Sequence, residues 1–91
     1  MSEVNIQVSM MTAVTETLKF KRGNPKVDHE KIMQHISNMA KNVRNQNAKI
    51  GMVAAASKTL LILEKEPNLT DKEVMKRVME ELPNILENIR A

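Results

Sequence analysis

The chain has 91 residues, a net charge of +3, a single aromatic residue and no cysteine. A domain of this size buries only about 60% of its unfolded surface, so association with another chain would help its stability. The lack of cysteine excludes disulfides, thiolate metal sites and thiol nucleophiles, and it favours a reducing cytoplasm as the location. Phe20 alone provides too little aromatic surface for the base stacking on which single-stranded RNA binding depends.

The sequence shows no signal for a membrane or for secretion. It opens with Met1-Ser2-Glu3 rather than with a basic segment, and no apolar run approaches the ~20 residues that cross a bilayer. We therefore expect an untargeted cytoplasmic protein that makes no contact with a membrane.

The first helix is predicted over residues 3–21, where apolar residues recur at helical spacing. The sequence Gly23-Asn24-Pro25 ends this helix, since glycine readily takes the left-handed conformation after a helix and Pro25 disfavours helical angles at Asn24. The apolar positions are Val4, Val8, Met11, Val14 and Leu18.

The second helix is predicted to be long, over residues 28–65. Asp28 can cap its amide end, and Glu66 is pushed out of helical angles by Pro67. Between these limits the apolar residues follow one another at steps of four and three, interrupted only at Gln46 and Ser57. This spacing is typical of one seam on one helix. The seam comprises Ile32, Ile36, Met39, Val43, Ile50, Val53 and Leu60.

A break in this helix is the alternative. A break usually shifts the phase of the apolar pattern, so we interpret the polar stretch 45–47 as helix interior. Gly51 nevertheless costs about 1 kcal/mol relative to alanine in a helix. A kink or break within residues 45–51 would give a compact four-helix monomer instead. In an unbroken helix, Gly51 and Ala55 share one face and would let another helix approach closely.

The third helix is predicted over residues 71–90. Thr70-Asp71-Lys72-Glu73 is a capping box, in which the Thr70 and Glu73 side chains each bond the other residue's amide. Pro83 removes a backbone donor and predicts a kink, after which the apolar stripe keeps its phase. That stripe comprises Met75, Val78, Leu82, Ile85 and Ile89.

These elements predict an all-α fold in one domain of residues 1–91, with helices in the order short, long, short. From Met52 to Leu63 the long helix is apolar on nearly every side, so more than one neighbouring helix must cover it. We expect an antiparallel homodimeric helical bundle, in which Gln46 either fixes the register by pairing with its own copy or lies at a bend in contact with water. The expected interface residues are Ile36, Met39, Val43, Gln46, Ile50, Val53, Leu60 and Leu61.

No motif for catalysis is evident. His29 and His35 are six residues apart and cannot share one metal on a helix, and glycine-rich phosphate loops and nucleophile elbows are absent. We expect no enzyme activity, cofactor or metal. The expected function is protein–protein interaction, assembly or regulation. A partner protein would bind an apolar, methionine-rich groove between the first and last helices.

Double-stranded DNA binding is the alternative function. Residues 1–50 hold eight Lys/Arg against four Asp/Glu, and the surplus gathers around the first loop. A short–long–short order of helices in a small basic chain resembles the histone fold, although the loop 66–68 is not basic here. The resemblance implies that cations around the first loop contact phosphates. The alternative is that these cations, in the last turn of a helix, only complement the helix dipole. The candidate contacts are Lys19, Lys21, Arg22, Lys26 and Lys31.

Overall fold

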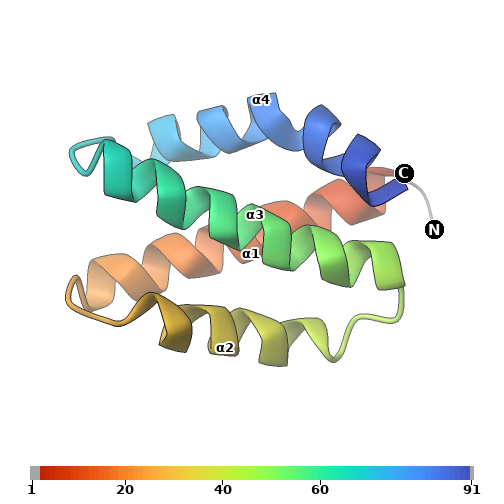
Figure 1. Ribbon diagram of the computed structural model, residues 1–91, viewed down its shortest axis with the longest axis horizontal. Helices are drawn as coiled ribbons and strands as arrows, with labels where there is room; N and C mark the ends of the chain where they lie inside the picture. The colour runs from red at the N-terminus through yellow and green to blue at the C-terminus, as the bar shows by residue number, and fades with distance from the viewer. Residues whose placement is uncertain (1–2, 91) are drawn as a thin grey trace.

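The computed structural model describes the backbone of residues 3–90 and the side chains of residues 5–88. Over this range the chain forms four helices and no strand (Figure 1). They are α1 (Glu3–Gly23), α2 (His29–Ala40), α3 (Gln46–Lys65) and α4 (Asp71–Arg90). The side chains of Val4 and Ile89, which belong to the predicted apolar stripes, lie outside the described part.

The predicted continuous helix over residues 28–65 is wrong, and with it the three-helix chain. The segment consists of α2 and α3, joined by residues 41–45. Four helices match the alternative in number, although the break falls mainly before the expected 45–51.

Asn45 explains the break. Its backbone is extended and its side-chain oxygen accepts the amide hydrogen of Ala48 at 3.0 Å, so it starts α3 as an N-cap. The apolar spacing persists across the break because Val43, in the loop, packs against both groups of core residues. A constant apolar phase therefore did not require a continuous helix.

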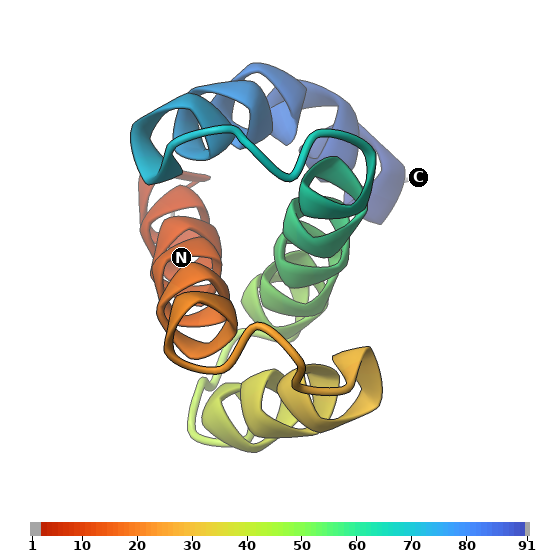
Figure 2. The same cartoon turned by 90° about the vertical axis from the view of Figure 1, so that its left-hand side faces the viewer.

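The helices α1 and α3 form the centre of the molecule, and α2 and α4 lie on opposite sides of this pair (Figure 2). The contact between α1 and α3 is the most extensive in the fold, whereas α2 and α4 do not touch within the described residues. Seen end-on, the four helices make a diamond whose short diagonal is the α1–α3 pair.

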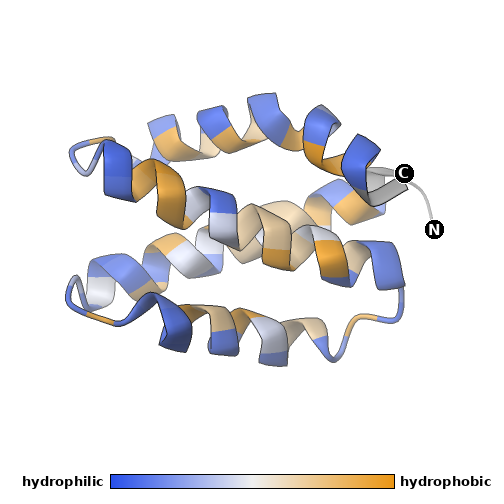
Figure 3. Ribbon diagram, viewed as in Figure 1, coloured by the Kyte–Doolittle hydropathy of each residue, from blue (hydrophilic) through white to orange (hydrophobic). Residues whose placement is uncertain are grey.

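Two apolar clusters fill this diamond, one on each side of the α1–α3 pair. Figure 3 shows the apolar side of α4 turned inwards and its polar side turned outwards. The α4 cluster contains Ile6, Met10, Val14, Leu18, Ala48, Ala55, Ile62, Leu63, Val74, Val78, Leu82 and Leu86. The α2 cluster contains Ala13, Val27, Ile32, Ile36, Ala40, Met52, Ala56 and Leu60.

Small residues make the α1–α3 contact close. Gly51 and Ala55 are both buried in α3, on the face that the sequence indicated for close approach. Thr17 in α1 and Thr59 in α3 are the two fully buried polar side chains among those described. Each hydroxyl donates to the carbonyl four residues earlier, at 2.7 Å and 2.8 Å, so neither is left unsatisfied.

The start of α4 has the predicted capping box. The Thr70 amide donates to the Glu73 carboxylate at 3.1 Å, and the Glu73 amide donates to the Thr70 hydroxyl at 3.2 Å. The hydrogen bond from the Thr70 backbone lowers the pKa of Glu73 below its ordinary value of 4.5. Helix α4 continues through Pro83 and arches across the α1–α3 pair (Figure 1).

Enlarging Ala55 should destabilise the fold through the α1–α3 contact. We expect Ala55→Leu to lower the free energy of unfolding by about 1–3 kcal/mol, because added methylenes force tightly packed helices apart. Urea unfolding followed by circular dichroism measures this. The matched control is Glu64→Leu at an exposed position of α3, with an expected change within about 0.5 kcal/mol. Equal effects would contradict a tight contact at Ala55.

The capping box should make stability depend on acid pH. Because the pKa of Glu73 is lower when folded than when unfolded, its contribution is present above pH 4.5 and is lost as the pH falls through the lower folded-state pKa. Glu73→Gln keeps a capping side chain that does not titrate, so its stability should fall less over that interval. Urea unfolding at stepwise lower pH tests this, with exposed Glu80→Gln as control. Identical pH curves for Glu73→Gln and the wild type would refute the assignment.

Candidate functional site

The residues predicted for a dimer interface do not share one face in the structure. Ile36 and Leu60 are buried in the α2 cluster, with 0% and 4% of their surface exposed. Met39 and Val43 are partly buried and pack against the same cluster. These four residues therefore contribute to the core of a single chain.

The other four predicted interface residues lie on α3 and remain accessible. Ile50 and Leu61 are 45% and 49% exposed, Gln46 is exposed and Val53 is half-buried. Leu61 lies away from the rest, beside α4, where it lines a polar hollow with Arg77. Gln46, Ile50 and Val53 come together along one groove.

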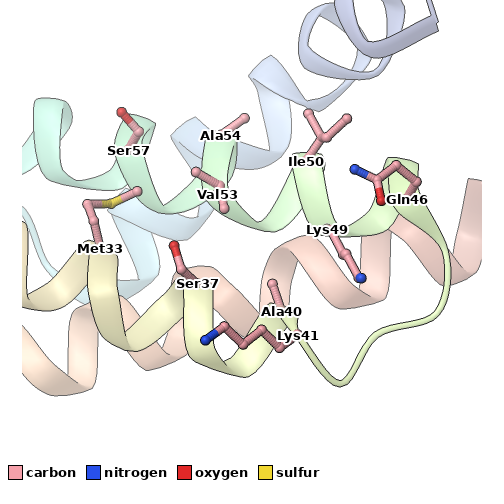
Figure 4. Close-up of a pocket in the computed structure, with 10 residues that line it drawn as sticks. All are labelled: Met33, Ser37, Ala40, Lys41, Gln46, Lys49, Ile50, Val53, Ala54 and Ser57. Atoms are coloured by element: carbon pink, nitrogen blue, oxygen red, sulfur yellow. The ribbon is translucent and has the colours of Figure 1, made fainter.

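This groove lies between α2 and α3 and has a volume of about 630 Å³ (Figure 4). Five of its ten lining residues are apolar, and the rest are serines, a glutamine and lysines. Helix α2 and its C-cap contribute Met33, Ser37, Ala40 and Lys41, and α3 contributes Gln46, Lys49, Ile50, Val53, Ala54 and Ser57. We call it the α2–α3 groove.

Small side chains are the reason that the groove is hollow. Four of the lining residues, Ser37, Ala40, Ala54 and Ser57, have side chains too small to fill the space beside the two helices. Larger side chains, Met33 and Ile50, stand at the sides (Figure 4). An apolar concave surface with a few polar groups is typical of a binding site.

The charge around the groove has one sign. From residue 31 to residue 63 the sequence contains five Lys/Arg and no Asp or Glu. Lys41 and Lys49 belong to the lining, at the end nearest the loop, and Arg44 is exposed in that loop. None of these three cations takes part in an ion pair among the described side chains. The groove is therefore apolar and flanked by positive charge.

Sequence reasoning missed most of this site. Met33, Ser37, Lys41 and Lys49 had no assigned role, because a continuous central helix would place α2 and α3 end to end rather than side by side. The signal that could have found the site is the run of residues 31–63, which is basic and lacks any acid.

A second groove lies between α1 and α4, where the sequence predicted a site for a partner. Its volume is about 480 Å³. Val8 and Met79 are 60% and 56% exposed there, and Met11, Leu82 and the acidic Glu16 also line it. Unlike the α2–α3 groove, it has no cation in its lining.

The predicted phosphate contacts do not form one free basic surface. The Arg22 guanidinium donates to the Asp71 carboxylate and to the Leu69 carbonyl, both at 2.8 Å. Arg22 thus ties α1 to the loop before α4. Lys19, Lys26 and Lys31 are exposed and Lys21 is half-buried, spread over α1, the first loop and α2.

The two histidines have different surroundings. His35 lies 3.1 Å from the Glu16 carboxylate and 5.0 Å from the Phe20 ring, so it joins α2 to α1. His29 is exposed at the start of α2. Among residues 5–88, no three His, Cys, Asp or Glu side chains gather in a way that could hold a metal ion. In the described part of the chain, no helix is long and apolar enough to cross a bilayer.

Comparison with protein-family models, with curated proteins and with solved structures gives no match to this chain. The similarity to the histone fold rested on a long middle helix, which the structure replaces with α2 and α3. The groove itself therefore provides the basis for a functional proposal.

Adjacent leucines in α3 should differ sharply in their contribution to stability. Leu60→Ala should lower the free energy of unfolding by about 2–5 kcal/mol, because it leaves a cavity in the α2 cluster. Leu61→Ala removes a side chain that is half in solvent and should cost less than about 1 kcal/mol. Urea unfolding of both variants measures the difference. Similar losses would contradict the register of α3.

Proposed function

We propose that this protein is a non-catalytic interaction module that binds a partner protein through the α2–α3 groove. The observation that carries the proposal is an open apolar groove of about 630 Å³ between two helices, with Ile50 45% exposed beside it. Its size suits a bound side-chain ridge, and a groove between helices is a common way to receive a helix from another protein.

A different protein, rather than a second copy, is the better supported partner. The prediction of a homodimer depends on the apolar residues 52–63, which need more neighbouring helices than a three-helix chain provides. Within the chain, α1, α2 and α4 cover Met52, Ala55, Ala56, Leu60 and Leu63. Apart from Leu61, the exposed large apolar side chains among the described residues are divided between the grooves: Ile50 lies in the α2–α3 groove, whereas Val8 and Met79 lie in the α1–α4 groove. The pairing of Arg22 with Asp71 supplies no support for the alternative of DNA binding.

Ile50→Asp should abolish partner binding without unfolding the protein, because Ile50 lies at the groove and is already half in water. The immobilised wild type, Ile50→Asp and Val8→Asp would each be exposed to an extract of the cells that make the protein. Val8→Asp is the matched control, since it puts the same charge into the α1–α4 groove. Mass spectrometry would identify the retained proteins.

We expect proteins that the wild type and Val8→Asp retain and that Ile50→Asp loses. If Val8→Asp alone fails to retain these proteins, the binding site is the α1–α4 groove instead. Retention of the same proteins by all three would overturn the proposal. Sedimentation equilibrium at several concentrations decides whether the partner is a second copy: a dimer that Ile50→Asp dissociates would assign the groove to self-association.

A further inference from the structure

We infer that the α2–α3 groove takes an amphipathic α-helix that carries acidic residues beside its apolar ridge. This inference rests on the proposed function and deepens it by naming the chemistry of the partner. It follows from three features of the described residues: the dimensions of the groove, its charge, and the absence of a suitable helix on a second copy of this chain.

The dimensions suit about three turns of helix. The lining residues of α3 run from Gln46 to Ser57, a stretch that at 1.5 Å per residue is roughly 18 Å long. Ala40 and Ala54 in the lining are small and leave room for an incoming apolar ridge, and the larger Met33 and Ile50 also line the groove. Methionine is flexible and polarizable, so Met33 can adjust to the side chains of a bound helix.

The charge selects acidic residues on that helix. Lys41 and Lys49 line the groove from opposite helices, near the loop that holds Arg44. None of the ten lining residues is acidic, and the ion pairs among residues 5–88 lie elsewhere. Carboxylates placed three or four positions from an apolar ridge would meet these cations at the edge of the groove.

A second copy offers no such helix. Helix α4 has the most acidic residues, but its apolar face is buried in its own core through Val74, Val78, Leu82 and Leu86. Presenting that face to another molecule would require unfolding of the chain that provides it. Nucleic acid fits less well, because half of the lining is apolar and would gain nothing from phosphate.

The test uses two labelled 14-residue peptides with blocked ends. Both carry leucines at helical spacing on one face and alanines elsewhere; one has four glutamates flanking the leucines and the other has four lysines there. Fluorescence anisotropy measures binding to the full chain. We expect the glutamate peptide to bind at least tenfold more tightly than the lysine peptide. The reason is that Lys41 and Lys49 attract its glutamates and repel the lysines of the other peptide, and high salt should reduce the difference.

Charge reversal assigns this preference to the groove. The double variant Lys41→Glu/Lys49→Glu should bind the lysine peptide better than the glutamate peptide. Lys72→Glu/Lys76→Glu changes the net charge equally on exposed positions of α4, on the opposite side of the molecule, and should leave the preference unchanged. Circular dichroism would verify that both variants stay folded.

Each result decides a separate point. If both peptides bind equally, or if the α4 variant alone changes the preference, the acidic partner is refuted while the groove remains a binding site. If neither peptide binds, a helical occupant is refuted. The proposed function is then tested separately, by whether the wild type retains proteins from the cell extract that Ile50→Asp does not retain. A DNA duplex provides the last comparison. If the wild type binds the duplex more tightly than the glutamate peptide, and Lys41→Glu/Lys49→Glu does not bind the duplex, the groove binds nucleic acid and the inference is wrong.

Discussion

Close packing of α1 against α3 is the constraint on which the rest of the structure depends. Gly51 and Ala55 are small enough to let the helices approach, and the buried hydroxyls of Thr17 and Thr59 are satisfied within their own helices. The pair therefore forms a wall with an apolar surface on each side. Helices α2 and α4 cover these two surfaces, and no contact joins them among the residues that the structure describes. One interhelical contact thus supports both clusters of a 91-residue chain.

The position of the groove follows from this arrangement. Helix α4 has 20 residues and covers its side of the wall along most of its length, whereas α2 has only 12. Alanine and serine at the α2–α3 boundary leave the edge of the second side open. A shorter covering helix with small residues at its edge gives a stable core and a hollow beside it.

The sequence predicted those parts of the fold that depend on local signals. The capping box at Thr70 and Glu73 is present, and a turn follows the first helix near Pro25. The continuous central helix failed because Val43 keeps an apolar phase from within a loop and because Asn45 caps α3. Periodicity does not distinguish one helix from two that pack on the same core, and it does not guarantee burial, since Ile50 is 45% exposed. The groove could not be predicted from a continuous helix. Such a helix places Ile50 and Val53 on its apolar seam and keeps them far from the α2 residues that line the groove with them.

Lys41, Arg44 and Lys49, the cations near the α2–α3 groove, make no ion pair among the described side chains. Where this chain uses ion pairs for structure, the partners are close: Arg22 joins Asp71, and Arg77 joins Glu66. The carboxylates of α2 and α3 are Glu30 and Glu64, near the ends of the two helices, and residues 31–63 contain none for the stabilising pairs that exposed helices commonly form. Adjacent cations such as Lys41 and Arg44 repel each other at a small cost to stability. Their place beside an apolar groove agrees with the proposed function, in which an acidic partner would provide the opposite charge.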